Sequence, residues 1–348
     1  MSSINTSKTL QNWYGQHKRD LPWRHTTDPY RIWISEIILQ QTRVIQGLDY
    51  YRRFIDRFQN ITMLANADED EVLKYWQGLG YYSRARNLHK TAQIVVNEYG
   101  GNFPKAHVDI LKLKGIGDYT AAAIVSFAYN QPFAVVDGNV YRFLSRYFGI
   151  DTAIDSNMGK KEFAALAQQI LDVAAPAAHN QSIMEFGALQ CIPAQPDCSV
   201  CPLQATCSAY SLNLVGVLPV KDGKTKVRDR FFNYFYIDYQ GDIFIQKRVS
   251  KDIWHNLYEL PLIESDRVFE LNEIVTLDLF ADVHKLEIDS TTYSFKHILS
   301  HQRIFARFFI VSIKNTNNLL DEMIRINLED LEKFAISRLT SLFFEQNK

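Results

Sequence analysis

The sequence predicts a mainly α N-terminal domain followed by a smaller α+β domain. Apolar residues recur with a helical period up to about residue 210, and aromatic, β-branched runs follow residue 230. A polar, basic segment at 218–226 separates the two patterns and is typical of a linker. With 348 residues the chain can bury one core in each domain. We expect the first domain, the linker and the second domain at 1–210, 211–228 and 229–348.

The helical elements of the first domain follow from local patterns. Apolar residues open it at Leu10 and Trp13, and a long periodic stretch covers 32–58. The segment 64–68 predicts a helix start, because acidic side chains crowd the first turn, where the positive end of the helix dipole stabilises them. The small apolar stretch 121–129 predicts a buried helix.

The second domain shows strand patterns and one helical tail. The runs 231–237 and 242–245, separated by a Gln-Gly pair, predict a β-hairpin. Residues 305–313 predict another strand, and 328–344 predict a helix.

Composition and charge exclude some classes and leave one open. The chain is 47% apolar and 22% charged, its start has no signal-peptide core, and no stretch offers the ~20 apolar residues of a membrane helix. We therefore expect a cytoplasmic protein. The net charge of −1 argues against a generic polyanion binder, but basic residues cluster at 82–90 and at Arg52, Arg53 and Arg57. Each cluster fits either a solvated helix face or a nucleic-acid contact.

All four cysteines of the chain lie in one short run with the spacing C-x6-C-x2-C-x5-C. They are Cys191, Cys198, Cys201 and Cys207. Disulfides are disfavoured because nothing else suggests export. A structural zinc site usually pairs two C-x2-C knuckles, and only one is present. The compact run therefore favours a four-cysteine iron–sulfur cluster, with zinc as the alternative.

Two glycines lie in a tight turn just before the buried helix. Gly115 and Gly117 allow close backbone approach, and the amides of the helix that follows can then hold a phosphate. An ordinary turn between helices would use the same residues.

The hairpin, Asp137 and the cysteine run together resemble the helix-hairpin-helix DNA glycosylases that carry an iron–sulfur cluster. That family includes the endonuclease III type and the MutY-type adenine glycosylases. Its turn reads L-P-G-V-G, whereas Lys114 replaces the proline here. The cysteine spacing matches at all four positions, so the resemblance implies a [4Fe-4S] cluster on these cysteines.

One position separates the two branches of that family. The bifunctional enzymes carry a lysine directly after the hairpin, whose amine forms a Schiff base with the sugar. Tyr119 occupies the matching position and cannot form an imine, while Lys112 and Lys114 lie on the other side of the turn. The resemblance therefore implies a monofunctional glycosylase.

Glu36 is the first candidate catalytic residue. On a helix it shares a face with Gln40 and Arg43 and lies among apolar neighbours. Apolar surroundings raise the pKa of a carboxyl group, which suits a general acid. The alternative is an ion pair with Arg43 on a wet face. The stretch S-E-x-x-L-Q-Q-T resembles the adenine-glycosylase signature, which implies that Glu36 protonates the departing adenine.

Asp137 is the second candidate. Cleavage of an N-glycosidic bond builds cationic character on the sugar, and a fixed carboxylate stabilises it. The Asp-Gly-Asn sequence also fits a turn before a helix. The resemblance makes Asp137 the second catalytic carboxylate, with Asn139 and Tyr119 positioning the two acids.

Further residues match DNA-contacting positions of the family. A target base has to leave the stack, and other groups fill the gap. The resemblance implies wedging by Gln41 and Tyr81, an adenine pocket with Arg24 and Gln181, and phosphate contacts from Arg84 and Arg86.

The C-terminal part resembles the MutT-like, Nudix-type domain of adenine glycosylases. Residues 253–261 match its core strand, and the metal-binding R-E-x-x-E-E box is absent. Ser300 and His301 match the loop that reads 8-oxoguanine, although Leu299 replaces the usual phenylalanine. A zinc site at the histidines flanking Ser300 is disfavoured, because no carboxylate or cysteine joins them.

Together these matches imply a monomeric, monofunctional adenine DNA glycosylase of base excision repair. Its substrate would be double-stranded DNA with adenine mispaired with 8-oxoguanine or guanine. Two alternatives remain open: a bifunctional endonuclease III-type glycosylase/lyase for damaged pyrimidines, and a non-catalytic mismatch sensor.

Overall fold

The computed structural model describes residues 3–223 and 226–347. Internal contacts divide the chain into two compact units. The first joins residues 1–66 with 90–224, and the second joins 67–89 with 225–348. Among the described residues, no helix is long and apolar enough to cross a membrane.

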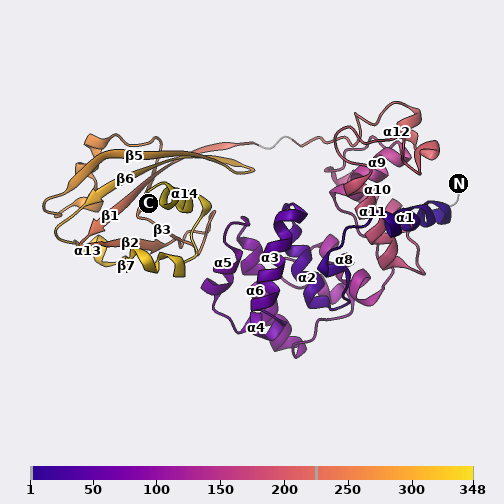
Figure 1. Cartoon of the computed structure of the whole chain (residues 1–348), viewed down its shortest axis with the longest axis horizontal. Helices are drawn as coiled ribbons and strands as arrows, with labels where there is room; N and C mark the ends of the chain where they lie inside the picture. The colour runs from indigo at the N-terminus through magenta and orange to yellow at the C-terminus, as the bar shows by residue number, and fades with distance from the viewer. Residues whose placement is uncertain (1–2, 224–225, 348) are drawn as a thin grey trace. The chain divides into compact units, whose positions relative to one another are not determined.

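The part of the chain up to residue 211 is helical (Figure 1). Its helices are α1 (Ser3–His17), η1 (Pro22–Arg24), α2 (Pro29–Leu39), α3 (Val44–Arg57), α4 (Ile61–Ala65), α5 (Glu69–Trp76), α6 (Ser83–Tyr99), α7 (His107–Ile110), α8 (Asp118–Tyr129), α9 (Gly138–Phe148), α10 (Asn157–Ile170), α11 (Pro176–Leu189), η2 (Gln204–Thr206) and α12 (Ser208–Ser211).

One core of the first unit lies where α1, α9, α10 and α11 meet. Trp13 of α1 and Phe143 of α9 both pack edge-on against Phe186 of α11, and Phe163 of α10 is fully buried beside them. The periodic apolar residues of each helix form the stripe that faces this core. The core fixes the N-terminus of α9, which carries Asp137.

The expected helix across residues 36–43 is wrong. Helix α2 ends at Leu39, Gln40 leaves helical geometry, and Gln41 has a φ of 56°. Helix α3 then begins at Val44 and buries Tyr51 and Phe54. Arg43 therefore does not share a helical face with Glu36. The helical period of the apolar residues correctly predicts a helix on each side of the break, but Gln41, in the left-handed conformation, separates the two helices.

The glycine turn and the buried helix are confirmed. Gly115 has a φ of 79°, Gly117 is the N-cap of α8, and residues 120–126 of α8 are buried. The predicted helix start after 64–68 is also confirmed, since α5 begins at Glu69 with acidic residues in its first turn.

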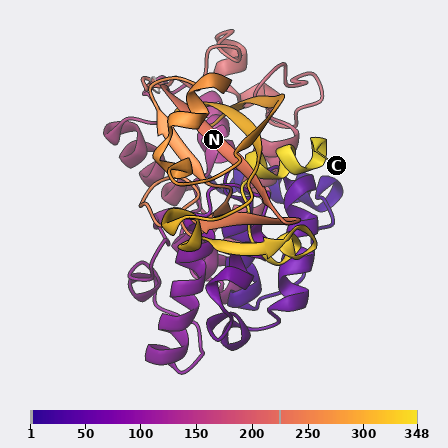
Figure 2. The ribbon, with the colours of Figure 1, turned by 90° about the vertical axis from the view of Figure 1, so that its left-hand side faces the viewer.

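The second unit is built on a seven-stranded sheet with the order β3-β2-β1-β6-β5, in which β4 pairs with β1 and β7 with β2 (Figures 1 and 2). Its elements are β1 (Arg228–Tyr239), β2 (Asp242–Lys247), β3 (Tyr258–Glu259), β4 (Leu262–Ser265), η3 (Leu271–Thr276), η4 (Asp278–Phe280), β5 (Glu287–Ile298), β6 (Gln302–Ser312), α13 (Asn318–Asp321), β7 (Ile324–Asn327), η5 (Leu328–Lys333) and α14 (Arg338–Gln346).

Side chains alternate across this sheet as the period of two requires. On one face of β1 and β6, Tyr234 stacks on Phe308, which stacks on Phe343 of α14. On the other face, Phe235 stacks on Phe309 in a second core. The predicted hairpin and the strand at 305–313 are confirmed as β1–β2 and β6.

Two expectations for this unit need correction. The helix expected over 328–344 is broken, because Ala335 and Ile336 pair with Tyr258 of β3 before α14 begins. The core strand expected at 253–261 is reduced to β3, since Trp254 and Asn256 have positive φ values of 59° and 65°.

Residues 67–89 belong to the second unit through polar contacts of α5. The carboxylate of Asp70 accepts from Lys247 Nζ at 2.6 Å and from the Tyr258 hydroxyl at 2.8 Å. Glu69 accepts from the Asn256 amide at 2.5 Å. The acidic first turn that starts α5 therefore also anchors this segment.

Candidate active site

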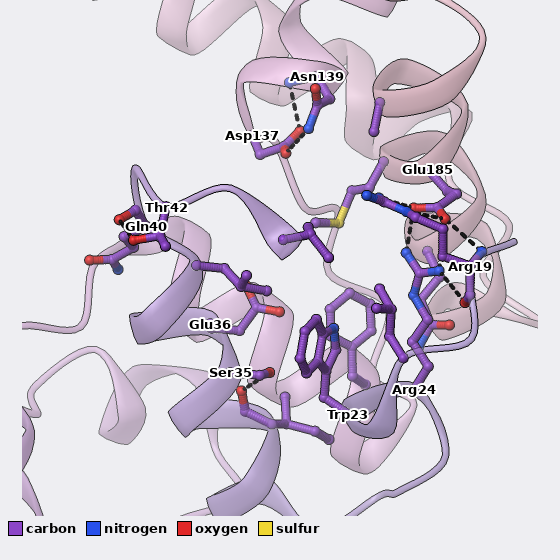
Figure 3. Close-up of a pocket in the computed structure, with 18 of the residues that line it drawn as sticks. Arg19, Trp23, Arg24, Ser35, Glu36, Gln40, Thr42, Asp137, Asn139 and Glu185 are labelled. Atoms are coloured by element: carbon purple, nitrogen blue, oxygen red, sulfur yellow. Dashed lines mark hydrogen bonds and ion pairs between the residues drawn. The ribbon is translucent and has the colours of Figure 1, made fainter. Parts of the chain in front are cut away.

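A cavity of about 490 Å³ lies within the first unit and gathers the predicted catalytic residues (Figure 3). It collects side chains from η1, α2, the α2–α3 turn, α8, the start of α9 and α11. Its polar lining residues are Arg19, Arg24, Ser35, Glu36, Gln40, Gln41, Thr42, Tyr119, Asp137, Asn139, Gln181 and Glu185.

Glu36 is a buried acid with one hydroxyl partner. It is 7% exposed on α2, and its Oε2 accepts a hydrogen bond from the Tyr119 hydroxyl at 2.6 Å. Burial raises the pKa of Glu36 to about 7; the Tyr119 hydrogen bond opposes the rise, and the nearby Asp137 adds to it. The pKa of Tyr119 is raised well above its usual value, mainly by burial, so its hydroxyl keeps its proton. A carboxyl group with a pKa raised this far can carry a proton near neutral pH.

Asp137 is fixed by the helix that follows it. As N-cap of α9, its Oδ1 accepts from the amides of Asn139 and Val140 at 2.9 and 2.8 Å, and its Oδ2 accepts from the Asn139 side chain at 2.7 Å. Burial raises the pKa of Asp137, while these hydrogen bonds oppose the rise. The turn that the sequence offered as an alternative is thus present. It aims the carboxylate at the cavity.

Arg142 stabilises this turn through hydrogen bonds. It is 8% exposed and donates to Asn139 Oδ1 at 2.8 Å, to the Gly187 carbonyl at 2.5 Å and to the Cys191 carbonyl at 2.7 Å. A Cβ on Gly187 would come within 2.6 Å of the Asn139 carbonyl oxygen. The close approach of α11 to α9 therefore depends on this glycine.

A third carboxylate in the cavity forms ion pairs with two arginines. Glu185 of α11 is 1% exposed and accepts from Arg19 and Arg24, each through two contacts between 2.5 and 2.9 Å (Figure 3). Burial opposes its ionisation, but hydrogen bonds from Arg19 and Arg24 outweigh this and lower the pKa of Glu185 to about 2. The wall thus holds one fixed negative charge between two positive ones.

The sequence reasoning missed Glu185 and Arg19. The signal was available, because Glu185 lies between Met184 and Phe186 in an apolar helix, just as Glu36 lies among isoleucines. The predicted pocket residue Gln181 lines the same cavity and accepts from the Tyr14 hydroxyl at 2.6 Å.

The four cysteines line one apolar cavity with Phe143, Tyr147 and Leu203. Arg146, which is 3% exposed, contacts the Cys191 sulfur at 3.5 Å and donates to the carbonyls of Ile192 and Pro193 at 2.7 and 2.9 Å.

The chemistry of this lining fits an iron–sulfur cluster, which is anionic when its ligands are thiolates. Burial raises the pKa of Cys201 to about 11 without a metal, so its ionisation would depend on metal binding. In the described residues, no group of three or more Cys, His, Asp or Glu side chains is placed so that it could hold a single metal ion. The support for a cluster is therefore the shared cavity.

Comparison with known proteins agrees with this geometry. The HhH-GPD superfamily of base excision DNA repair proteins matches residues 34–171, and the NUDIX domain matches 233–346. The adenine DNA glycosylase of Buchnera aphidicola subsp. Baizongia pistaciae is 36% identical over 88% of this chain and 85% of its own length. That of subsp. Schizaphis graminum is 34% identical over 97% and 92%. The chain belongs to the adenine DNA glycosylase family.

A solved structure supports the same fold for the helical part. The structure of a thermostable thymine-DNA glycosylase is 31% identical in sequence to this chain, with a TM-score of 0.56. The match covers 60% of this chain and 97% of that one. The helix-hairpin-helix fold and the Nudix-like second domain that the sequence predicted are thus confirmed.

The residues predicted to wedge into DNA and those predicted to read the lesion line two separate cavities. Gln41 is exposed at the cavity rim of the first unit. Tyr81, Ser300 and His301 line a separate cavity of about 540 Å³ within the second unit. There the hydroxyl groups of Tyr81 and Ser300 are hydrogen-bonded to each other, and Ser300 lies between β5 and β6.

The two arginines expected to contact phosphate are held by protein groups. Arg84 donates to the carbonyls of Leu79 and Gly80, and burial lowers the pKa of its guanidinium to about 10. Arg86 donates to the His255 carbonyl at 2.7 Å. Both shape the loop around Tyr81, and their contact with DNA stays a prediction. Gly115 and Gly117 are exposed at the start of α8, where amides can meet a phosphate.

Proposed function

We propose that this chain is a monofunctional adenine DNA glycosylase of base excision repair. The observation that carries the proposal is that one cavity holds both a buried Glu36, whose pKa is raised, and a fixed Asp137. The names of the two Buchnera relatives support adenine as the base removed.

The two carboxyl groups divide the chemistry of hydrolysis. Glu36 donates its proton to a ring nitrogen of adenine as the N-glycosidic bond breaks, so the bonding electron pair leaves with a neutral base. Asp137 stabilises the cation that develops on the sugar. Water then adds to the sugar carbon, its released proton returns to the Glu36 carboxylate, and an abasic site remains in an uncut strand. Tyr119 holds Glu36 in place, and Asn139 does the same for Asp137.

Tyr119 also favours this function over strand scission. A lyase needs an amine that forms an imine with the sugar, and no such amine comes from Tyr119. Lys112 lies before the turn and donates to Asp109 at 2.8 Å, and Lys114 is exposed in the turn itself. The bifunctional alternative therefore lacks a nucleophile at the position where its family carries one.

The charged wall of Arg19, Arg24 and Glu185 suits the recognition of a polar base. Carboxylate and guanidinium groups on a buried wall can accept from an exocyclic amine and donate to ring nitrogens. This wall, with Gln181 and Trp23, is the adenine pocket in our proposal.

Cys191, Cys198, Cys201 and Cys207 would hold a [4Fe-4S] cluster, as the donor set and the shared cavity support. When bound, the cluster would supply a redox-capable centre and would cross-link the loop 193–202. Arg146 would balance its negative charge, and the chemistry of base removal remains with Glu36 and Asp137.

The preferred substrate is duplex DNA with adenine opposite 8-oxoguanine or guanine. Ser300 and His301 of the Nudix-like domain would read the lesion, while Gln41 and Tyr81 occupy the gap left by the extruded adenine. Backbone amides after Gly115 and Gly117 would position the phosphates. The boundaries 1–210, 211–228 and 229–348 remain our assignment for the domains.

A single-turnover assay tests the activity. Duplexes with adenine opposite 8-oxoguanine are incubated with the enzyme and then split into samples with and without alkali. We expect nicking at adenine that depends on alkali. We expect no release of thymine from an otherwise identical duplex with thymine opposite guanine. Nicking without alkali, together with covalent trapping by borohydride, would favour the lyase. Tight binding of the mispair without base release would favour the sensor.

A further inference from the structure

The backbone that leads into Asp137 is held by a buried side-chain amide. Residues 132–136, between α8 and α9, belong to no helix or strand. The Asn180 side chain of α11 accepts a hydrogen bond from the Val135 amide at 3.1 Å and donates one to the Phe133 carbonyl at 2.8 Å. Buried backbone groups outside regular structure need other partners, and here one side chain supplies two of them just before Asp137.

Asn180 also joins this segment to α8. Its amide nitrogen donates to Ser126 Oγ at 2.8 Å, and the two residues are buried, with exposed fractions of 1% and 0%. Helix α8 carries Tyr119, which donates to Glu36, and Val135 belongs to a small apolar core against which Tyr119 packs. The Asn180 amide therefore links the helix that holds the first carboxyl group to the segment that ends at the second.

Asn180 lies on a helix of the catalytic cavity but does not line the cavity. Its neighbour Gln181 and, one turn beyond, Glu185 line it from α11, whereas the Asn180 side chain is directed to α8 and to the segment before α9. Asn180 thus acts through its hydrogen bonds, at the place where three walls of the cavity meet.

We propose that Asn180 is a positioning residue for Asp137: its buried amide fixes residues 133–135 against α8 and thereby places the Asp137 carboxylate relative to Glu36. The N-cap hydrogen bonds of Asp137 fix its carboxylate relative to α9 alone, and Asn180 adds the connection to α8. A shift of a reacting group by about 1 Å can lower a rate by ~10²-fold, so this second connection matters for the chemistry. The proposal rests on the proposed function in one respect, namely that Asp137 stabilises the cation on the sugar.

The same segment supplies a matched control. Gln168 of α10 makes an equivalent pair of hydrogen bonds, accepting from the Ala134 amide at 3.0 Å and donating to the Pro132 carbonyl at 2.9 Å. Gln168 is exposed, so water can replace both bonds when the side chain is removed. The two amides therefore differ in burial and in the bond that Asn180 alone makes to Ser126.

Amide hydrogen exchange of the full-length protein tests the positioning without any assay of activity. The amides of Asn139 and Val140 donate to Asp137 Oδ1, so their exchange reports whether the carboxylate stays in place. Such amides exchange when the structure opens locally, and we expect Asn180→Ala to accelerate their exchange by about tenfold or more. Gln168→Ala should leave it unchanged. Unchanged exchange in Asn180→Ala would overturn the proposal.

A second variant decides if Asn180→Ala does not fold. Ser126→Ala keeps both hydrogen bonds between Asn180 and the segment and removes only the bond to α8. We expect a smaller acceleration at the same two amides. No acceleration in Ser126→Ala would then contradict the link through α8.

Single-turnover kinetics test the consequence for the reaction. Asn180→Ala should lower the maximal rate of adenine removal by about ten- to a hundredfold. Its affinity for a duplex with a non-cleavable adenine analogue should match that of the wild type. Burial raises the pKa of Asp137 and the N-cap hydrogen bonds oppose the rise, so weakening these bonds should move the acid limb of the pH–rate profile to higher pH. The alkaline limb, which reports Glu36, should stay in place.

The outcomes separate positioning from a loss of stability. If the rate of Asn180→Ala falls together with its thermal midpoint while the acid limb stays in place, the residue supports the fold only and the proposal is wrong. Faster exchange with an unchanged rate would also contradict it. If the wild type removes no adenine, the proposed function fails, while the exchange of the two amides still decides whether Asn180 fixes Asp137.

Discussion

The catalytic cavity and the lesion cavity place their polar groups in opposite environments. Glu36 and Asp137 come from a helix interior and a helix N-cap, and burial shifts the pKa of both. Ser300 and Tyr81 come from a hairpin loop and a left-handed turn residue, and Tyr81 is 46% exposed. Buried groups on regular elements can carry chemistry because water does not screen them. Exposed groups on loops form weaker contacts, which contribute to the choice of binding partner. Substitutions in the first cavity should therefore change rates greatly, and those in the second should change preference slightly.

The largest effect is expected for Glu36→Gln. The amide keeps the shape of the side chain but removes the proton that leaves with adenine, so the single-turnover rate should fall by ~10²–10⁴. Binding to the mispair should remain. Glu98→Gln, an exposed carboxylate on α6, is the matched control and should act as wild type. A Glu36→Gln variant with a near-normal rate would remove Glu36 from the mechanism.

The second-largest effect is expected for Gly187→Ala. This substitution removes no reacting group, but it adds a methyl group where α11 approaches α9 most closely in the site. The added methyl group would meet the Asn139 carbonyl at 2.6 Å and push α11 from α9. Such overpacking costs about 1–3 kcal/mol, and it would displace Asp137 with Asn139. We expect the excision rate to fall about tenfold or more, with a lower midpoint in thermal unfolding. Gly216→Ala, where a Cβ meets nothing within 4 Å, is the control for an alanine that has room. Equal stability of the two variants would show that the helices can separate without cost.

The sequence predicted part of the catalytic cavity, and the reason is physical. Glu36, Tyr119 and Asp137 lie on or next to helices whose periodic burial can be read locally, and all three reach one cavity. The break at Gln40 and Gln41 escaped prediction because no glycine or proline marks the left-handed turn. The pairing of Ala335 and Ile336 with β3 escaped it because long-range strand pairing has no local pattern. The charge cluster on Glu185 joins residues over 160 positions apart, which spacing alone does not reveal.

The third prediction concerns pH. Excision needs Glu36 protonated and Asp137 ionised, so the rate should fall as pH rises through about 7 and fall again in acid. Stability has a linked sign. The pKa of Glu36 is raised on folding, so its contribution is present below its unfolded pKa of about 4.5 and is lost as pH rises through about 7. Glu36→Gln should therefore gain about 1–3 kcal/mol over wild type between pH 4.5 and 8. Urea unfolding of both proteins at each pH measures this gain, and a constant difference would contradict the raised pKa.

The smallest effect is expected for Ser300→Ala in the lesion cavity. Its hydroxyl is hydrogen-bonded to Tyr81 in the structure, so the variant loses one exposed hydrogen bond and no buried charge. A bond of this kind contributes about 0.5–1.5 kcal/mol, or roughly two- to twelvefold in affinity. We expect weaker binding only where 8-oxoguanine faces the adenine, with the rate on adenine opposite guanine unchanged. Ser294→Ala on β5 is a control in the same hairpin. If Ser300→Ala lowered the maximal excision rate on both duplexes by a hundredfold, the division between a chemical cavity and a reading cavity would not hold, because an exposed loop hydroxyl would then be part of the chemistry.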